Sequence, residues 1–548
     1  MKANGVNIWR FSAGNKVLRI ILISSVFCLS LYSSAFPQAA FMYRVVLKDK
    51  GNPQFSLAHP EEFLSEKSLD RRRRQNLPID SIDLPIDEAY LNAVTSLGFK
   101  IGAKSKWTNT LVAQMSDTSQ LNSLRGLPFV DSIYCVWKGT LTEAESKNDS
   151  LAYESNALKV SRYGEGFTQI ALHNGQLLHE AGFRGQGVSI AVIDGGFERA
   201  DNIYCIDFSR VKEVKSFSHE TSDPLRSGVT HGSYVLSCML ANQESAMIGS
   251  APEADYYLFR TEVDADEYPV EEDYWTAALE YADSIGIDVV TTSLGYSTFN
   301  DSLMNHTVAM LDGKTLPASR AASLAASRGM LVFHAAGNER NKGWVKITFP
   351  ADADNIITVG SVMADSTLSS FSSVGYAADG RIKPDLVAMG SGVCIANTAG
   401  LTRGNGTSFA TPILAGLGAC LWQALPNLTA SEMLDVLRKS GNHYLQPDSL
   451  SGYGIPDVYK AYIDAITSIP SVKSAETAPI YAFHNELYIS NINIGKTPVL
   501  RIYSCLGNCV FSKSGFSSPV DISALQRGVY IAHLQIGSEQ IIRKFIKQ

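Results

Sequence analysis

The sequence predicts a central α/β domain with a mainly parallel sheet and helices on both faces of that sheet. A small α+β domain precedes it, and a small β-sandwich follows it. Between residues 161 and 468, short apolar runs alternate with helical stretches, which is the pattern of parallel strands joined by helices. Residues 41–140 mix strands with a helical segment, whereas residues 478–548 carry short alternating strands and a turn at Gly528.

Length and composition agree with this organisation and exclude several classes of protein. A chain of 548 residues allows about three to five domains. Hydrophobic residues make up 45% and charged residues 18%, so the chain can bury cores and is not a disordered tail protein. The net charge of −7 argues against nucleic acid as the main ligand, because phosphate binding needs a basic face. The eight cysteines include no Cys-x-x-Cys pair, and no His-Glu-x-x-His motif occurs, which disfavours a disulfide-built small fold and a zinc peptidase.

The first 35 residues have the features of a secretory signal peptide. Lys16 and Arg19 precede an apolar run at residues 20–31. That run has 12 residues, which is too short for a bilayer that needs about 20. Small residues at 33–35 then offer a cleavage site. We therefore expect residues 1–35 to be a signal peptide; a buried N-terminal strand is the alternative.

Residues 41–140 predict a small α+β domain. Its expected strands are Tyr43–Leu47, Thr110–Gln114 and Phe129–Tyr134. A charged helical stretch at residues 61–74 ends in four arginines, Arg71–Arg74, which suit a nucleic-acid patch, a processing site or a solvated helix face. Acidic residues such as Glu66 and Asp70 precede the arginines, so a solvated face with internal charge pairs is favoured. The polar residues 142–156 then predict a linker.

Residues 161–468 form the predicted α/β domain. Its expected strands are Val188–Ile193, Tyr256–Phe259, Ile287–Thr291, Met330–Phe333 and Ile356–Val359. Its expected helices include Asp273–Ser284 and Pro317–Arg328. About 300 residues is near the upper limit for a single core.

Two polar residues follow or interrupt apolar segments of this domain. Asp194 ends the buried run at 188–193, and a carboxylate at the C-terminal end of a parallel strand lies where α/β proteins place their sites. His231 opens an apolar stretch at 234–241 that suits a helix. Taken alone, the aspartate is better explained as a turn residue and the histidine as a core or cap residue.

Ser408 is a stronger candidate for a reacting site, and Asn338 becomes a candidate in combination with the other three residues. Ser408 follows Gly406 and Thr407 and begins a helix rich in small residues, a combination that a simple N-cap does not need. The segment Phe333–Asn338 ends a strand with an amide side chain, although Gly337-Asn338 taken alone is better explained as an ordinary turn. Acyl transfer needs donors aimed at the developing oxyanion, and the Asn338 side chain with the Ser408 backbone N–H would supply two.

Asp, His and Ser in this chain order are the arrangement of the subtilisin-like serine proteases. Residues 161–468 resemble the catalytic domain of that family and imply its fold. The matching segments are Ala191–Phe197, His231–Val235, Gly249–Pro252, Ser293–Gly295, Ala335–Asn338 and Gly406–Pro412. The α/β-hydrolase order of Ser, Asp and His is disfavoured, because both other residues precede Ser408 and residue 410 is Ala.

The resemblance implies a role for each matched residue. Asp194 would orient the histidine, His231 would be the general base, Ser408 the nucleophile and Asn338 an oxyanion donor. The backbone expected to pair with an extended peptide substrate belongs to Ser293, Leu294 and Gly295. The residues expected to border the first specificity pocket are Ala335, Ala336 and Gly337.

The flanking segments resemble parts of the same kind of precursor. Residues 41–140 resemble the N-terminal inhibitor propeptides of the family. Residues 478–548 resemble the sorting domain of the type IX secretion system, carried by exported proteins of Bacteroidetes-type bacteria and often removed after passage; an ordinary accessory β-domain is the alternative. The carrying segments are Leu487–Ser490, Asp521–Leu525, Gly528–Ile531 and Arg543–Lys547. Cys505 and Cys509 in this domain could be bridged or remain two free thiols.

Together these features predict a secreted serine endopeptidase that is made as an inhibited precursor and hydrolyses peptide bonds through an acyl-enzyme. It would reach the medium or the cell surface via the periplasm. Its expected partners are protein or peptide substrates, its own propeptide as inhibitor and the secretion machinery, but no nucleic acid. No organic cofactor is required. Structural calcium is common in the family, but no ligands are assigned here, and the acidic residues 264–267 are interpreted as a solvated loop.

Two other functions compete with this interpretation. A surface adhesion protein with an inactive protease-like domain is opposed by the intact set of Asp194, His231, Ser408 and Asn338. An esterase or lipase is opposed by the order of these residues. The sequence leaves the cleavage preference, the natural substrate, the maturation sites and the oligomeric state open.

Overall fold

The computed structural model describes residues 39–140, 161–220, 223–264, 266–467, 480–483, 485–489, 497–504, 508–536 and 539–547. The chain divides into two compact units, residues 1–458 and 459–548. The predicted signal peptide at 1–35, the predicted linker at 142–156 and Cys505 lie outside the described residues. The domain limits drawn from the sequence remain predictions.

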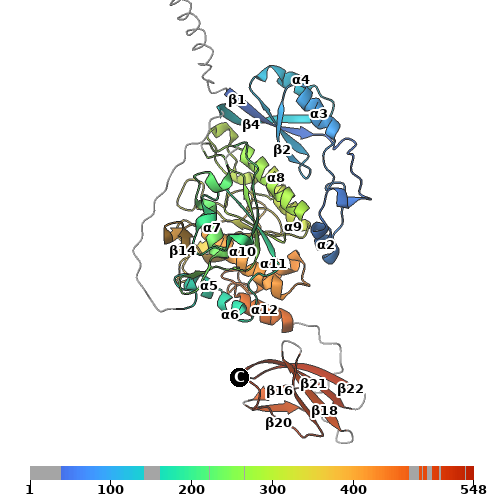
Figure 1. The fold of residues 1–548 in the computed structure, drawn as a ribbon, viewed down its shortest axis with the longest axis vertical. Coiled ribbons are helices and arrows are strands. Elements are labelled where there is room, and N and C mark those ends of the chain that lie inside the picture. The colour runs from blue at the N-terminus through green and yellow to red at the C-terminus, as the bar shows by residue number, and fades with distance from the viewer. Residues whose placement is uncertain are drawn as a thin grey trace, which may run out of the picture. The chain divides into compact units, whose positions relative to one another are not determined.

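The N-terminal domain is an antiparallel sheet with helices packed on it, as predicted (Figure 1). Its strands, in the spatial order β2-β3-β1-β4, are β1 (Ala39–Leu47), β2 (Lys100–Ser105), β3 (Thr110–Met115) and β4 (Val130–Thr140). Its helices are α2 (Glu66–Arg74), α3 (Glu88–Ser96) and α4 (Leu121–Arg125). Val45 and Leu111 of the sheet share one apolar core with Val94 of α3 and Leu124 of α4, and all four are fully buried.

The predicted helical stretch at 61–74 is two pieces rather than one. A 3-10 turn spans Pro60–Glu62, and α2 begins only after Ser65. The Ser65 side chain accepts a hydrogen bond from the backbone N–H of Ser68 at 3.2 Å, so it caps the helix N-terminus and separates the two pieces.

The solvated-face interpretation of the four arginines holds for one half of the run and is wrong for the other. Arg73 is exposed and pairs with Glu66 and Asp70 on its own helix, as expected. Arg71 and Arg72 are 0% and 1% exposed and pair with Asp283, more than 200 positions along the chain. Local charge spacing could not reveal that distant partner.

The central sheet has seven strands, all paired in parallel, in the order β13-β12-β11-β10-β5-β9-β6. The strands are β5 (Ser189–Asp194), β6 (Val211–Ser216), β9 (Asp255–Arg260), β10 (Val289–Thr292), β11 (Leu331–Ala335), β12 (Ile357–Val362) and β13 (Leu386–Met389). The five strands predicted from apolar runs are all present, displaced by one to three residues at their ends. The mainly parallel α/β fold predicted for this domain is therefore confirmed.

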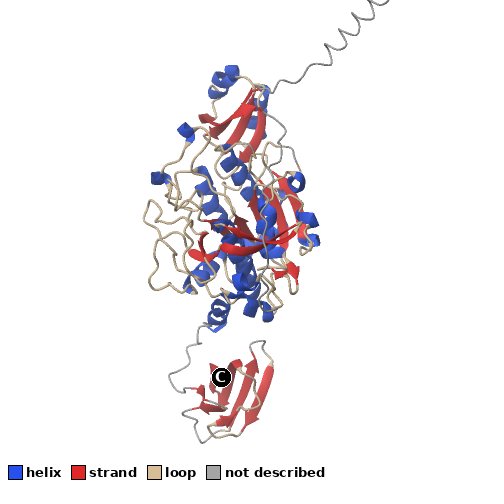
Figure 2. Cartoon of the chain, turned by 90° about the vertical axis from the view of Figure 1, so that its left-hand side faces the viewer, coloured by secondary structure: helices blue, strands red, loops and turns tan. Residues whose placement is uncertain are grey.

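Helices cover both faces of this sheet (Figure 2). They are α7 (His231–Leu240), α8 (Val270–Ile285), α9 (Pro317–Ser327), α10 (Thr407–Ala424) and α11 (Ala430–Lys439). On one face, α8 and α9 share an apolar core with Ala191, Val290 and Val332. On the other face, α10 lies so close to β11 that a Cβ added at Gly418 would come within 2.7 Å of the Phe333 ring. Small residues in α10 therefore permit close packing of helix on sheet.

Smaller elements surround the sheet. They are α5 (Phe167–Ala171), α6 (Gly175–Glu180), the short pair β7 (Asn242–Gln243) and β8 (Met247–Ile248), and the antiparallel hairpin β14 (Ser391–Asn397) and β15 (Gly400–Asn405).

The second unit begins at Tyr459, the second residue of α12 (Val458–Thr467). After this helix it contains two antiparallel sheets. One sheet contains β16 (Ile480–Phe483), β17 (Glu486–Ile489) and β20 (Val520–Asp521). The other contains β18 (Pro498–Ser504), β19 (Cys509–Ser514), β21 (Gly528–Ile536) and β22 (Glu539–Lys547). Residues of both sheets share one core that includes Leu487, Leu500 and Leu534, which fits the predicted β-sandwich.

The packing of α10 gives a first testable prediction. A Cβ at Gly416 would lie 2.9 Å from Cβ of Ser250 and 3.1 Å from the backbone nitrogen of Ala251, so Gly416→Ala overpacks this contact. We expect the free energy of unfolding to fall by about 1–3 kcal/mol, measured by thermal or urea unfolding. Gly343→Ala is the control, because nothing lies within 4 Å of its added Cβ. An equal melting temperature for the two variants would contradict this account of α10.

Candidate active site

Asp194 is the last residue of β5 and lies at the carboxyl edge of the sheet. Its side chain is 0% exposed, and its Oδ1 accepts hydrogen bonds from the backbone N–H of Gly195 and from Nδ1 of His231, each at 2.8 Å. The backbone N–H of Thr261, just past the end of the neighbouring strand β9, donates to the Asp194 carbonyl at 3.2 Å. Sheet pairing and these contacts fix the carboxylate in one orientation.

His231 is the first residue of α7 and faces that carboxylate. Burial favours the neutral imidazole and would by itself lower the pKa of His231, but the charge and hydrogen bond of Asp194, with the charge of Glu262, raise the pKa above its ordinary value of 6.5. The hydrogen bond through Nδ1 leaves Nε2 as the nitrogen free to exchange a proton with another group. The pair therefore has the geometry of an oriented base.

Ser408 is the second residue of α10 and is 8% exposed. Its Oγ donates to the Ser293 carbonyl at 3.4 Å, and Oγ of Ser293 donates to the Ser408 carbonyl at 2.8 Å. The ring of Phe409, the next residue, lies 6.0 Å from the His231 ring between centroids. No hydrogen bond joins His231 to Ser408 within the described contacts, so the structure brings the three residues into one region without closing the last contact of a triad.

Asn338 lies beyond the end of β11, the strand two places from β5. Its Oδ1 accepts hydrogen bonds from the backbone N–H of Thr407 at 2.9 Å and from the Thr407 hydroxyl at 3.1 Å. Because the amide oxygen is held by the residue before Ser408, Nδ2 is the group left to donate. A Cβ at Gly406 would lie 3.7 Å from Nδ2, which places this nitrogen beside the turn that leads into α10.

Thr407 is a residue of the candidate site that sequence reasoning missed. Its hydroxyl also accepts a hydrogen bond from the backbone N–H of Gly337 at 3.2 Å, so it ties α10 to the segment after β11. Its position between Gly406 and Ser408, within the motif of the candidate nucleophile, is the sequence feature that could have identified it.

The two segments expected to bind substrate follow the adjacent strands β10 and β11. Ser293 is buried, Leu294 is half-buried and Gly295 is exposed. Ala335 and Ala336 are buried, and Gly337 is half-buried with φ of +104°. Both segments converge on Thr348, because a Cβ added at Gly295 would clash with Thr348 Oγ1 and one at Gly337 would lie 3.0 Å from it. Sequence reasoning did not identify Thr348.

Three carboxylates gather near Asp194 and His231. One oxygen from each of Glu262, Glu267 and Glu271 lies within 4.8 Å of the others. Calcium takes six to eight oxygen ligands. Glu262 already accepts from the Tyr296 hydroxyl, and Glu271 accepts from the backbone N–H groups of Val263 and Tyr268. The trio alone does not make a calcium site, so calcium remains a prediction without ligands.

Comparison with known proteins identifies the family. The model of the subtilase family matches residues 185–454. Subtilisin NAT of Bacillus subtilis subsp. natto is 30% identical over 325 residues, which cover 58% of this chain and 76% of that protein. The chain belongs to the subtilase family. A subtilisin of Bacillus pumilus is 31% identical over 290 residues, covering 52% of this chain and 94% of that protein. The protein is thus a serine peptidase of the subtilisin type.

The flanking domains of this subtilase have their own matches. The model of the peptidase S8 propeptide domain of Bacteroidota matches residues 42–151. The model of a secretion system C-terminal sorting domain matches residues 484–548, which indicates export to the medium or the cell surface. The resemblances to an inhibitor propeptide and a sorting domain are thereby confirmed.

A solved structure supports the fold of the subtilase. The crystal structure of the epidermin leader peptide processing serine protease (EpiP) from Staphylococcus aureus has a TM-score of 0.53 and 17% identity, covering 80% of this chain and 100% of that one. Within the described ranges, no helix combines the length and apolar character that crossing a membrane requires.

The electrostatics of the pair give a second prediction. In a Ser408→Ala background, NMR titration should give His231 a pKa above 6.5, because the Asp194 carboxylate stabilises the imidazolium. Adding Asp194→Asn removes that charge and leaves burial, so the pKa should fall below 6.5. The control is Asp207→Asn, which removes an exposed capping carboxylate. A His231 pKa that does not respond to Asp194→Asn would contradict the pairing.

Proposed function

We propose that this subtilase is a secreted endopeptidase in which Ser408, His231 and Asp194 form the catalytic triad. The 2.8 Å hydrogen bond between Asp194 and His231, beside Ser408 at the start of α10, carries this assignment. In the first step, His231 Nε2 takes the proton of Ser408 Oγ while Oγ bonds to the carbonyl carbon of the scissile peptide. Asp194 holds the imidazole in the required tautomer and stabilises its positive form.

The tetrahedral intermediate carries negative charge on the former carbonyl oxygen. Asn338 Nδ2 and the backbone N–H of Ser408 would donate to this oxygen, since the first N–H groups of a helix have no partner within it. The positive end of α10 adds to the stabilisation. Collapse of the intermediate breaks the carbon–nitrogen bond, and His231 gives its proton to the leaving amine.

The acyl-enzyme is then hydrolysed by water. His231 takes a proton from the water as its oxygen bonds to the acyl carbon, and it returns the proton to Ser408 Oγ as the ester bond breaks. The cycle leaves a carboxylic acid and an amine and restores the enzyme. No organic cofactor takes part in these steps.

Substrate would bind as an extended peptide along the edge of the sheet. The exposed backbone at Gly295 is available for pairing, and the first side-chain pocket would be bordered by Ala335, Ala336 and Gly337. The chain would pass through the periplasm, use its C-terminal domain to engage the secretion machinery and remain inhibited by its own propeptide until matured.

The oxyanion assignment predicts the effect of Asn338→Ala. Removing one donor of this kind typically lowers kcat by about 10²–10³-fold, and we expect that loss. A modest fall in melting temperature should accompany it, because the substitution also removes the two hydrogen bonds that Asn338 Oδ1 accepts from Thr407. Kinetics on a peptide substrate at saturation provide the measurement. Turnover equal to wild type would remove Asn338 from the mechanism.

The nucleophile assignment predicts a difference in the intact mass of the secreted protein. Wild type should lose the propeptide domain, whereas Ser408→Ala should keep it, because Ser408 would cleave its own chain. Mass spectrometry of both secreted proteins checks this and locates the cut. Loss of the domain in both proteins would show that another peptidase does the processing, and activity would then be measured on added substrate.

A further inference from the structure

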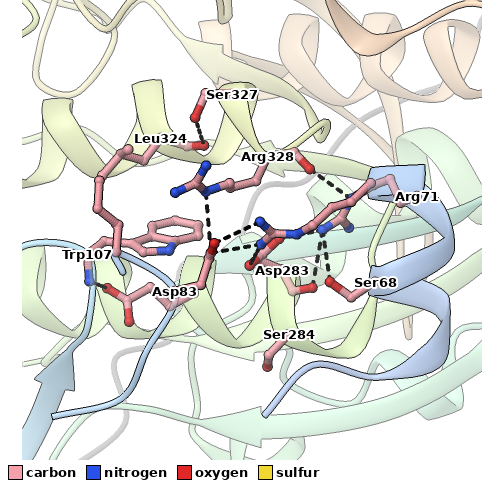
Figure 3. Close-up of polar contacts among 12 residues, drawn as sticks. Ser68, Arg71, Asp83, Trp107, Asp283, Ser284, Leu324, Ser327 and Arg328 are labelled. Carbon is pink, nitrogen blue, oxygen red and sulfur yellow. Dashed lines mark hydrogen bonds and ion pairs between the residues drawn. The ribbon is translucent and has the colours of Figure 1, made fainter. Parts of the chain in front are cut away.

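Residues 60–83 of the propeptide domain, which we call the arginine arm, lie against the catalytic domain at the C-terminal ends of α8 and α9 (Figure 3). Arg71 of α2 enters this region and is 0% exposed. Its Nε donates to the Arg328 carbonyl at 3.1 Å, and its two terminal nitrogens donate to the carbonyls of Ile287 and Asp283 and to the Asp283 carboxylate. Arg71 is therefore bound by the catalytic domain through every nitrogen of its guanidinium.

Arg72 completes a buried ionic network. It makes two hydrogen bonds to Asp83 of the same arm, at 3.1 and 3.0 Å, and one to Asp283 at 2.7 Å. Arg328, which follows α9, pairs in turn with Asp83 at 3.3 Å and with Asp80 at 2.9 Å. Three guanidinium groups thus face three carboxylates, and Asp283 is the carboxylate that the catalytic domain contributes.

The arm also satisfies backbone groups that the helices cannot satisfy themselves. The last carbonyls of a helix have no partner within it and attract cations. Arg71 takes this role for the carbonyl of Arg328 at the end of α9 and for that of Ile287 just past α8. Gln75 donates to the Gly329 carbonyl at 2.8 Å and accepts from the backbone N–H of Ala430, the first residue of α11, at 3.0 Å. The arm therefore links three helices of the catalytic domain.

A second set of contacts joins the propeptide sheet to α8 at other residues. Glu280 accepts hydrogen bonds from the backbone N–H groups of Lys106 and Trp107 and from the Ser105 hydroxyl. Arg44 of β1 pairs with Asp273 at 2.6 Å. The propeptide is thus held at two places, and the contacts of the arm use none of the residues of the sheet.

We propose that the arginine arm is an anchor that keeps the propeptide bound after the chain is cut between the two domains, with Asp283 as its receptor on the enzyme. The consequence for activity rests on the proposed function: the enzyme becomes active only after Arg71 and Arg72 have dissociated from Asp283. Fully buried, hydrogen-bonded charge pairs act mainly on the dissociation rate, because all of their bonds must break before water reaches the charges.

The test measures propeptide release in the full chain carrying Ser408→Ala, so that it does not depend on the activity of the chain itself. Residues 141–160 contain Glu143, Glu145 and Glu154, and a glutamate-specific endopeptidase is used to cut there, with intact mass showing the site. Gel filtration after dilution then gives the rate at which the cut propeptide leaves the catalytic domain.

We expect Arg71→Met and Asp283→Asn to release the propeptide at least tenfold faster than the parent. The matched control is Arg73→Met, because Arg73 is exposed and pairs within its own arm. Arg71→Lys serves if the methionine variant does not fold; it keeps the charge but loses the planar fork, and faster release is expected there too. Release rates equal to the parent in Arg71→Lys and Asp283→Asn would overturn the proposal.

Activity measurements on the wild-type chain test the proposed function separately from the anchor. If Ser408 is the nucleophile, wild type with Arg71→Met should gain activity on a peptide substrate sooner after its own cut than wild type alone. Absence of turnover in both chains would count against the proposed function, while the release rates in the Ser408→Ala background would still decide whether the arm is an anchor.

Discussion

The candidate catalytic groups depend on one constraint, which is that parallel strands all end at the same edge of a sheet. Adjacent strands β5, β10 and β11 therefore deliver Asp194, Ser293 and the segment leading to Asn338 to a common edge. The backbone register fixes these positions without any contact between the side chains. The two remaining groups come from helices. His231 is the first residue of α7. Ser408 comes from α10, which reaches this edge because small residues let that helix lie directly on the strands.

Much of the fold could be predicted, because strands buried on both faces appear in the sequence as uninterrupted apolar runs. One strand that was not predicted, β13, is a fully buried apolar run like the predicted ones, whereas others lack that signal. The edge strand β6 reads Val-Lys-Glu-Val-Lys-Ser and is only partly buried, so its sequence has no apolar run. In the hairpin, β15 contains glycines and polar residues and likewise lacks such a run, whereas β14 has a buried apolar run at Val393–Ala396.

In the candidate site too, some residues are identified by a local motif, whereas others are identified only by contacts with residues distant in sequence. Asp194, His231, Ser408 and Asn338 could be found because each stands in a recognisable local segment. Thr407 stands in the same motif as Ser408, but its contacts with Asn338 and Gly337 are distant in sequence, and Thr348 has no local pattern that marks it. The arginine run gives the clearest case. Spacing explains Arg73, whose partners lie within two helical turns, but the partner of Arg71 is on α8.

The contacts between propeptide and enzyme combine apolar packing with buried charge pairs. Trp107 packs in the core shared by α8 and α9, and Met42 and Trp137 pack with Val270 and Tyr274, while Asp283 and Asp273 pair with arginines. A wholly apolar interface of equal size would leave a larger exposed hydrophobic patch on the enzyme once the propeptide departs, and such patches favour aggregation. Charged groups such as Asp283 and Glu280 instead become hydrated when their partners leave, so they keep part of the freed surface compatible with water. Buried ion pairs add little net stability over apolar contacts, because desolvation offsets their attraction. Buried ion pairs therefore suit an interface that must be specific while the propeptide is bound and must not promote aggregation after it dissociates.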